Sequence, residues 1–198
     1  MVNVAVLVSG GGTNLQAILD AEDAGTLQSG KVTLVVSNNP NAYALTRAQK
    51  HGVETLVLSK TEYPTQYEFE TALIAALQAH DIDLIVLAGF MRILTVNFTS
   101  KYPERILNVH PALIPSFCGK GFYGLRVHEA ALQYGVKVTG ATVHFVNEIP
   151  DGGKIIAQKA VYIEDGDTPE ILQKRVMEQA EWILLPAAIE KVAKEYSK

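Results

Sequence analysis

The sequence predicts an α/β fold: a Rossmann-like, open, mostly parallel twisted sheet with flanking helices, followed by a mixed C-terminal hairpin and a long helix. Two observations support this prediction. Short β-branched apolar runs alternate with segments of helical periodicity through residues 1–109, and continuous apolar runs are typical of parallel strands that are buried on both faces. From residue 111 onward, the pattern changes to a long loop, a hairpin and a last helix.

The first part of the chain contains five expected strands with helices between them. Leu15, Ile18 and Leu19 give the first of these helices an apolar face that can pack on a sheet. The expected strands are Val4–Val8, Val32–Val36, Glu54–Leu56, Leu84–Leu87 and Ile106–Val109, and the expected helices are Asn14–Asp23, Ala42–His51 and Gln66–Ala79.

The second part begins with residues 111–126, which are rich in Pro and Gly and are expected to form a long loop. Pro150-Asp151-Gly152-Gly153 is a turn signal between two extended runs, so these runs are expected to pair as a hairpin. Thr168 and Pro169 are expected to open the last helix as its N-cap and first residue, and Pro186 is expected to kink it. The short helix is expected at Val127–Tyr134, and the extended runs are Val138–Val146 and Lys154–Tyr162.

The length of 198 residues fits a single domain spanning 1–198. A chain of this size buries roughly 70% of its unfolded surface, so its core needs no disulfide or metal. The single cysteine, Cys118, has no partner for a disulfide or a zinc site, which favours a reducing, cytoplasmic location. No apolar run approaches the ~18 residues that span a bilayer, and the N-terminus is expected to be a strand rather than a signal peptide.

The charge pattern argues against nucleic acid as a partner. The formal net charge is -4 and the basic residues are scattered, whereas a nucleic-acid-binding protein needs a basic stripe to neutralise phosphates. A small phosphorylated ligand stays open, because one helix N-terminus can bind it without a basic surface. No metal is expected, since no His, Cys and Asp cluster has ligand spacing.

A glycine-rich segment, Ser9-Gly10-Gly11-Gly12-Thr13-Asn14, lies directly between the first strand and the first helix. Free N–H groups and the positive end of the helix dipole favour an anion at such a position. The segment lacks the lysine of a P-loop. It also has Leu15 in place of the third glycine of a dinucleotide fingerprint, and Ser37-Asn38-Asn39 offers no carboxylate for a ribose. We therefore expect a phosphate site, with a plain tight turn as the alternative.

The sharpest signal is the segment from Leu107 to Pro111, which ends a predicted strand. Ligand sites of such sheets lie at the carboxyl ends of the strands. Alternation puts Asn108 and His110 on the same side of the strand, roughly 6–7 Å apart. An amide beside an imidazole can stabilise an oxyanion and transfer protons in acyl transfer. Asp151, on its Gly-flanked turn, could approach His110, raise the pKa of its imidazole and orient the ring.

A structural role for the same residues stays open. A histidine at a strand end is often a satisfied structural residue, and Asp-Gly-Gly is common turn chemistry. Nucleophilic catalysis is less favoured, because Cys118 has no histidine at a suitable spacing and no serine lies in a Gly-x-Ser-x-Gly elbow. Among the other histidines, His128 is expected to be a solvated surface residue and His144 a strand residue, each with substrate contact as the alternative. Trp182 is expected in the core.

These motifs together resemble those of the folate-dependent formyltransferases. Asn108-Val109-His110-Pro111-Ala112-Leu113-Ile114-Pro115, followed by Asp151-Gly152-Gly153, is similar to the catalytic signature of that family. Val8–Ile18 is similar to the acceptor-phosphate loop, and Leu87–Leu94 to the folate-cleft segment, of the branch that formylates glycinamide ribonucleotide in purine synthesis. The resemblance covers essentially the whole chain, and several separate motifs in the correct order are more specific than any one of them.

The resemblance implies a reaction and its substrates. The formyl group of 10-formyltetrahydrofolate, a co-substrate, passes directly to the primary amine of glycinamide ribonucleotide through a tetrahedral intermediate. Asn108 and protonated His110 stabilise the oxyanion of that intermediate, while Asp151 sustains the imidazolium and relays a proton through a water. The implied partners are these two small molecules, with no metal, nucleic acid or membrane, and a homodimer is left open.

The resemblance also implies binding residues. In this interpretation residues 1–100 carry the phosphate-binding loop, and residues 101–198 form the catalytic and folate-binding half. Gly89 and His144 are implied as acceptor contacts. The residues implied for the acceptor phosphate are Gly11, Gly12, Thr13, Asn14 and Glu181, and those implied for folate are Met91, Arg92, Ile93, Leu94, Asn108, Glu148, Ile149, Pro150 and Asp151.

The chain departs from the family pattern in two places. The loop 116–126 is longer than usual and could act as a mobile lid over the acceptor, with Arg126 where many relatives carry a histidine. Gln66 lies near the position where some relatives carry an arginine for the folate tail. These departures affect the expected contacts of the acceptor and of the tail, and they leave the expected chemistry unchanged.

Three other interpretations compete with this one. A deformylase would pass the formyl group to water and would carry an additional N-terminal regulatory domain, and a tRNA formyltransferase would carry a further C-terminal domain and a basic surface. Neither addition is expected here. From a different class, a dinucleotide-dependent oxidoreductase would use the glycine loop alone, and the missing third glycine and ribose acid argue against it.

Overall fold

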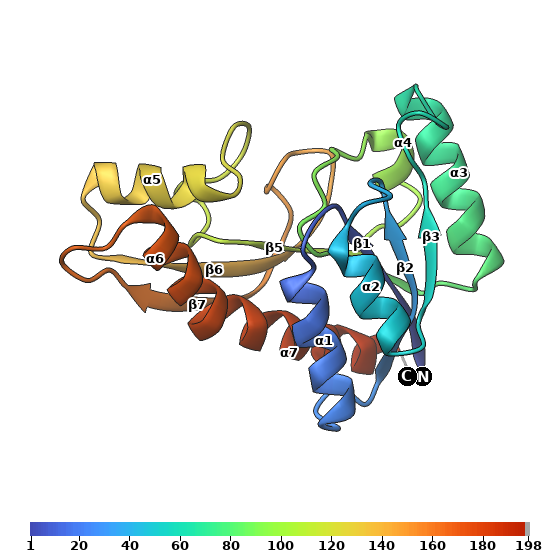
Figure 1. Cartoon of the computed structure of the whole chain (residues 1–198), viewed down its shortest axis with the longest axis horizontal. Coiled ribbons are helices and arrows are strands. Elements are labelled where there is room, and N and C mark those ends of the chain that lie inside the picture. Colours follow the sequence, from blue (N-terminus) through green and yellow to red (C-terminus); the bar gives the residue numbers. More distant parts are fainter. Residues whose placement is uncertain (197–198) are drawn as a thin grey trace.

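A computed structural model of the chain, which describes residues 1–196, confirms the α/β architecture (Figure 1). A seven-stranded sheet has the order β3-β2-β1-β4-β5-β6-β7. The first five strands pair in parallel, and β6 pairs antiparallel with both β5 and β7, so the predicted mostly parallel sheet and C-terminal hairpin are confirmed. The strands are β1 (Val2–Val8), β2 (Gly30–Ser37), β3 (Glu54–Val57), β4 (Leu84–Leu87), β5 (Ile106–His110), β6 (Val138–Phe145) and β7 (Ile155–Tyr162).

The helices follow the predicted spacing, with two differences. A short helix, α4, was not predicted. The expected last helix is three segments, because a π-helical turn, η1, interrupts it upstream of Pro186, and the following α-helix continues through that proline. The helices are α1 (Thr13–Asp23), α2 (Tyr43–Lys50), α3 (Gln66–Ala79), α4 (Val96–Thr99), α5 (Leu125–Tyr134), α6 (Pro169–Val176), η1 (Met177–Glu181) and α7 (Trp182–Tyr196).

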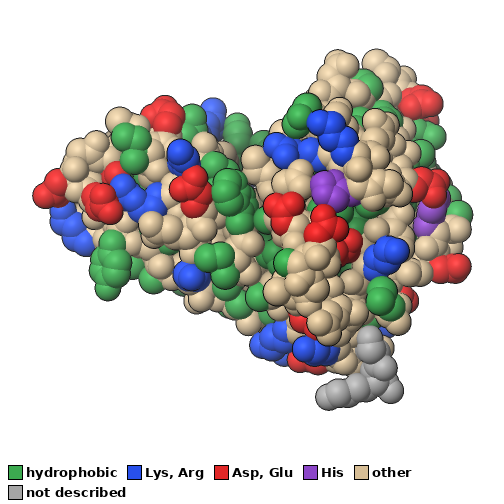
Figure 2. All heavy atoms as spheres, turned by 60° about the horizontal axis from the view of Figure 1, so that its bottom comes forward, with side chains coloured by type: hydrophobic (Ala, Val, Ile, Leu, Met, Phe, Trp, Pro, Cys, Tyr) green, Lys and Arg blue, Asp and Glu red, His purple; other side chains and the backbone are tan. Residues whose placement is uncertain are grey.

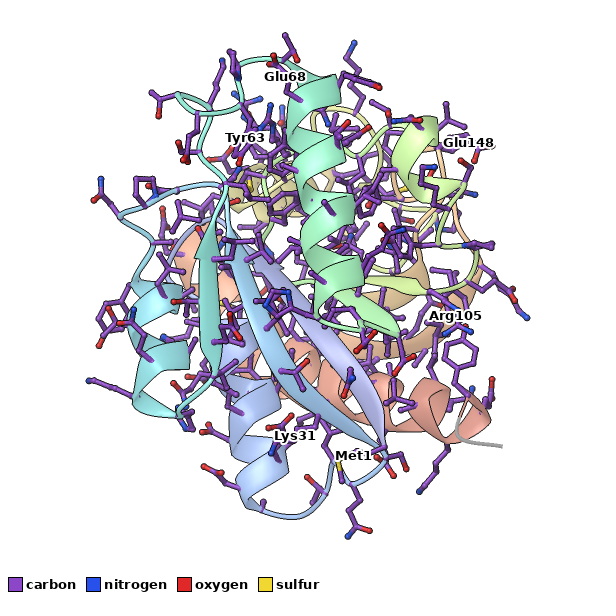
Figure 3. The ribbon with its side chains drawn as sticks, turned by 90° about the vertical axis from the view of Figure 1, so that its right-hand side faces the viewer. Met1, Lys31, Tyr63, Glu68, Arg105 and Glu148 are labelled. Carbon is purple, nitrogen blue, oxygen red and sulfur yellow. The ribbon has the colours of Figure 1, made fainter. Side chains whose placement is uncertain are left out.

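Alternation along β1 explains how the sheet acquires a layer of helices on each face. Val4 and Val6 belong to one buried cluster, which they share with residues of α1 and α7. Ala5 and Leu7 belong to a second cluster, which they share with residues of α3. Successive side chains of a strand point to opposite faces, so a wholly apolar strand must be covered on both sides. Figure 3 shows α3 lying across the second face.

The carboxyl ends of the parallel strands define one edge of the molecule. In Figure 3, Met1 and Lys31 lie at the edge where β1 and β2 begin, whereas Tyr63, Glu68 and Glu148 lie at the opposite edge. Segment 146–150 of the β6–β7 connection, which contains Glu148, therefore lies at the edge where ligands of open α/β sheets bind.

The surface in Figure 2 carries acidic and basic side chains in an interspersed arrangement, and no broad field of one sign covers that face. Among the described residues, no helix combines the length and the apolar character that crossing a membrane requires.

Candidate active site

The pairing of β5 and β6 brings together the polar residues at the end of β5. Asn108 is directly opposite His144, and His110 is opposite Thr142. Residues directly opposite in an antiparallel pair have neighbouring side chains, and Nδ2 of Asn108 lies 3.2 Å from Nε2 of His144. His110 and His144 are 4% and 1% exposed, so both imidazoles lie in the interior rather than at a solvated strand end.

Asp151 reaches both histidines from the β6–β7 turn. Its Oδ2 lies 3.6 Å from Nδ1 of His110, and its Oδ1 lies 3.6 Å from Nε2 of His144. The backbone of Asp151 has φ = 55°, a left-handed conformation that favours Gly, Asn and Asp. The structure thus brings Asn108, His110 and Asp151 together, as the sequence predicted, and adds His144 as the residue that joins them.

The two glycines that follow Asp151 are needed for this turn. A Cβ on Gly152 would lie 2.6 Å from Cγ2 of Ile149, and a Cβ on Gly153 would lie 1.7 Å from the carbonyl oxygen of Phe145. The N–H of Gly152 closes the turn by donating to the carbonyl of Ile149 at 2.9 Å. The Gly-Gly pair therefore does more than end a strand, because it lets the turn fold tightly against β6.

Burial and charge oppose each other at His110. Burial lowers the pKa of His110 below its ordinary value, although the charge of Asp151 and the hydrogen bond to the carbonyl of Phe117 act to raise it. Burial alone would raise the pKa of Asp151, but its interaction with His144, the charge of His110 and the N–H of Gly119 lower that pKa below its ordinary value. At neutral pH the unliganded site therefore holds an ionised Asp151 beside a largely neutral His110.

The loop 116–126 supplies two backbone groups that the sequence did not indicate. The carbonyl of Phe117 accepts a hydrogen bond from Nε2 of His110 at 2.8 Å, and the N–H of Gly119 donates to Oδ2 of Asp151 at 2.8 Å. The ring of Phe117 makes edge contacts with Phe122 and with Tyr134 of α5. The loop is thus packed against α5 and holds His110 and Asp151 from one side.

A cleft of about 140 Å³ borders Asn108, His144 and Asp151. The sequence predicted most of its lining, and Leu87 and Phe90 belong to the predicted folate-cleft segment 87–94 without having been named as contacts. Val146 and Asn147 were missed, because only the fold brings them to the cleft. Met91 and Gly89 do not line it: Met91 is 61% exposed, and its N–H donates to Oγ of Ser9 at 2.8 Å. The predicted residues that do line the cleft are Arg92, Ile93, Leu94, Asn108, Glu148, Ile149, Pro150 and Asp151, with His144 beside them.

The glycine-rich segment forms the entry to α1. Gly12 is the N-cap with φ = 73° and offers no side-chain cap, so the first N–H groups of the helix have no side-chain acceptor at that position. Asn14 donates to the carboxylate of Glu181 at 2.8 Å, and burial raises the pKa of Glu181 although this bond lowers it. Thr13 contacts the sulfur of Met177. The structure therefore joins Asn14 and Glu181, which lie far apart in the sequence.

The prediction for His128 was wrong. The side chain of His128 is 0% exposed, and Val127 and Ala131 of the same helix, α5, are buried as well. Neither ring nitrogen has a hydrogen-bond partner within residues 1–196. Burial and the nearby charge of His110 lower the pKa of His128 to about 4. The polar residue was expected in water, but the inward face of α5 includes it.

No group of three or more His, Cys, Asp or Glu side chains among residues 1–196 has an arrangement that could hold a metal ion. Cys118 is a free thiol that donates to the carbonyl of Pro115 at 3.3 Å. Burial and the charge of Asp151 raise the pKa of this thiol above its ordinary value. Such a thiol is a poor nucleophile at neutral pH, and the site offers instead an amide, two imidazoles and a carboxylate.

Comparisons with known proteins identify the family. The formyl transferase family matches residues 2–189. The chain is 40% identical over 189 residues to phosphoribosylglycinamide formyltransferase of Haemophilus influenzae, covering 96% of this chain and 86% of that protein. It is 44% identical over 192 residues to the trifunctional purine biosynthetic protein adenosine-3 of Gallus gallus, covering 97% of this chain but only 18% of that longer protein.

A solved structure has the same fold. The crystal structure of glycinamide ribonucleotide transformylase 1 from Symbiobacterium toebii superimposes with a TM-score of 0.91 at 43% identity, covering 98% of this chain and 89% of that one. The residues matched by the formyl transferase family, 2–189, include the glycine loop, the end of β5 and the β6–β7 turn. The chain belongs to the formyl transferase family.

Proposed function

We propose that the protein transfers the formyl group of 10-formyltetrahydrofolate to the primary amine of glycinamide ribonucleotide. The observation that carries this proposal is the convergence of Asn108, His110 and Asp151 at the carboxyl end of β5, beside a cleft. The names of full-length relatives such as the Haemophilus influenzae enzyme support the choice of acceptor.

In this proposal the acceptor binds through its phosphate at the start of α1. The backbone of Gly11, Gly12, Thr13 and Asn14 holds the phosphate, because free N–H groups and the helix dipole favour an anion there. Glu181 accepts from Asn14, and its second oxygen is then available to a hydroxyl of the acceptor. Gly89 and His144 complete the acceptor contacts.

The donor binds in the cleft between segments 91–94 and 148–151. Backbone groups of Glu148, Ile149 and Pro150 contact the pterin, and Arg92 lies beside it with its guanidinium 4.0 Å from the ring centroid of Phe69. Met91 contributes through its backbone at the rim. Asn108 and Asp151 border the same cleft and therefore meet the formyl group.

The reaction is direct attack of the amine nitrogen on the formyl carbon, which forms a C–N bond and moves the carbonyl electron pair to oxygen. Asn108 donates to this oxyanion. His110 is largely neutral before the reaction, so it accepts the proton that the attacking amine loses, and the resulting imidazolium, which Asp151 stabilises, donates to the oxyanion. The carbonyl re-forms as the bond to folate N10 breaks, and this proton passes from His110 to N10 through a water held by Asp151.

The remaining parts of the proposal concern the protein as a whole. Residues 1–198 form one domain, the reaction needs no metal and no nucleic acid, and its two partners are glycinamide ribonucleotide and the folate donor. A cytoplasmic location stays a prediction from the sequence, which leaves a homodimer open.

The test follows deformylation of 10-formyl-5,8-dideazafolate by absorbance, with and without glycinamide ribonucleotide. We expect a signal that depends on the acceptor. A signal of the same size without the acceptor would identify a hydrolase, and no signal in either case would overturn the proposed reaction. In the same assay we expect Asn108→Ala to lower turnover roughly 10²–10³-fold. That result would place the chemistry at the end of β5.

A further inference from the structure

Three consecutive carbonyl groups of the glycine loop are bound from the side of β2 and α2, whereas that of Gly12 accepts from the N–H of Gln16 in α1. The carbonyl of Ser9 accepts from Nδ2 of Asn39 at 3.2 Å, and that of Gly10 accepts from the N–H of Ala44 at 3.1 Å. The carbonyl of Gly11 accepts from Nε of Arg47 at 2.8 Å. Three consecutive peptide groups are therefore oriented by residues of the neighbouring β2–α2 unit.

This orientation decides where the N–H groups of the loop point. In a trans peptide the C=O of one residue and the N–H of the next point in opposite directions. Because the carbonyls of Gly10 and Gly11 point towards α2, the N–H groups of Gly11 and Gly12 point away from it. Within residues 1–196 neither N–H has a hydrogen-bond acceptor, so both are available to an external anion beside the free N–H groups that begin α1.

Two further contacts hold the side chain of Arg47 in place. Its Nη1 donates to Oε1 of Gln16 in α1 at 2.9 Å, and its guanidinium lies 5.0 Å from the ring centroid of Tyr43. The loop is also close to α2, since a Cβ on Gly12 would lie 2.6 Å from Cβ of Ala44. Arg47 thus connects α2, the glycine loop and α1, and it is the only one of the three donors that carries a charge.

We propose that Arg47 is a positioning residue for acceptor binding: its Nε–H fixes the Gly11–Gly12 peptide so that the N–H of Gly12 faces the acceptor phosphate. This inference rests on the proposed function for the identity of the acceptor. It predicts an effect on the phosphate-bearing acceptor alone, because Arg47 acts through the loop and does not touch the reacting atoms.

Two neutral variants separate the hydrogen bond from the charge. Arg47→Met keeps the side chain as far as the position of Nε and removes every donor, whereas Arg47→Gln places an amide Nε2 at the chain position of the arginine Nε. Lys50→Met is the matched control, because Lys50 is an exposed cation on the same helix. Each variant is assayed with glycinamide ribonucleotide and with the same acceptor lacking its phosphate.

We expect Arg47→Met to raise KM for glycinamide ribonucleotide roughly tenfold, the usual effect of losing one hydrogen bond from a charged group. Its kcat should stay within about threefold, because only binding of the acceptor is weakened. Arg47→Gln should restore KM to within about threefold of the starting protein, and Lys50→Met should leave KM unchanged. The inference would be overturned if Arg47→Met raised KM equally for the acceptor that lacks phosphate. It would also be overturned if Arg47→Gln raised KM for glycinamide ribonucleotide as much as Arg47→Met.

A binding measurement separates this inference from the proposed function. NMR titration with ribose 5-phosphate requires no turnover, and Arg47→Met should weaken its binding roughly tenfold while Lys50→Met does not. If the unaltered protein failed to formylate glycinamide ribonucleotide, the proposed function would be wrong, and this titration would still decide the role of Arg47. Equal binding of ribose 5-phosphate by Arg47→Met and the unaltered protein would overturn the inference.

Discussion

Nδ2 of Asn108 lies 3.2 Å from Nε2 of His144, and Oδ1 of Asp151 lies 3.6 Å from the same ring nitrogen. Nδ1 of His144 lies 2.8 Å from the carbonyl of Phe145, and a carbonyl can only accept, so Nδ1 carries the proton. When the ring carries only that proton, the lone pair on Nε2 accepts from the amide of Asn108; a second proton, on Nε2, would point to Oδ1 of Asp151 at 3.6 Å. In the singly protonated form, His144 fixes the amide of Asn108 and leaves its second N–H available to an oxyanion.

Replacing His144 should lower turnover without preventing folate binding. We expect His144→Phe to lower kcat by up to roughly tenfold, because Asn108 loses the hydrogen bond that orients its amide. Such a bond is worth about 0.5–1.5 kcal/mol, and about 1.4 kcal/mol corresponds to a factor of ten in rate. His144→Gln keeps an acceptor for Asn108 and should recover part of that loss. Rapid-mixing kinetics and a folate-binding titration measure the two effects, and a His144→Phe variant with normal kcat would remove the proposed role of His144.

Removing the charge of Asp151 should lower the pKa of His110 further. Burial already holds this pKa below its ordinary value, and Asp151 opposes that shift. Asp151→Asn keeps the shape and deletes the charge, so the imidazolium loses its stabilising partner and its proton is released at lower pH. NMR titration of the imidazole signals measures the change.

The control for this titration is His80, which lies at the C-terminal end of α3. The hydrogen bond to the carbonyl of Ala76, together with Glu54, raises the pKa of His80 above its ordinary value. Asp151→Asn should leave this pKa where it is. An unchanged pKa of His110 in the variant would mean that Asp151 does not act on the imidazole.

Substitution of Gly153 should disturb the site through the backbone. Its missing Cβ leaves room for the carbonyl of Phe145, 1.7 Å from where that Cβ would lie, and the same carbonyl fixes the tautomer of His144. We expect Gly153→Ala to lower both the melting temperature and kcat, because the turn must move away from β6. Lys154→Ala, at the next and exposed position, is the control that should change neither. A Gly153→Ala variant with normal kcat would show that the turn tolerates this movement.

The apolar pattern of the sequence was sufficient to predict the strands, and the end of β5 was sufficient to indicate where the candidate site lies. Apolar runs predicted β1 and β4 because both faces of each strand are buried, and the end of β5 marked Asn108 and His110. The pairing of Asn108 with His144 could not be predicted, since it depends on the register of two strands that are far apart in the sequence. A shift of one residue would have placed His144 on the other face.

The missed groups share a different cause. Phe117 and Gly119 contribute backbone atoms, whose use no side-chain pattern reveals. Arg47 acts on a carbonyl of a loop that precedes it by a whole strand, so its position in an ordinary amphipathic helix gave no signal. The polar character of His128 suggested solvent, but tertiary packing of α5 decided its burial.

The buried His128 should make the protein sensitive to acid. Its pKa is about 4 in the folded protein, against an ordinary value of 6.5. Between these two pH values the unfolded chain binds a proton that the folded chain does not, so stability falls as the pH falls from 6.5 to 4. A shift of this size corresponds to about 3 kcal/mol of unfolding free energy at pH 4.

His128→Phe should remove this loss. Both ring nitrogens are buried and without hydrogen-bond partners among the described residues, so an apolar ring of similar shape leaves no polar group unpaired. Urea unfolding at pH 7, 5.5 and 4.5 should show the free energy of the variant declining less steeply than that of the starting protein. His80→Gln gives the opposite sign: the raised pKa of His80 stabilises the fold below 6.5, and this contribution is lost as the pH rises through the folded pKa. If His128→Phe declined as steeply as the starting protein, His128 would have to be protonated inside the fold, and its burial without partners would be wrong.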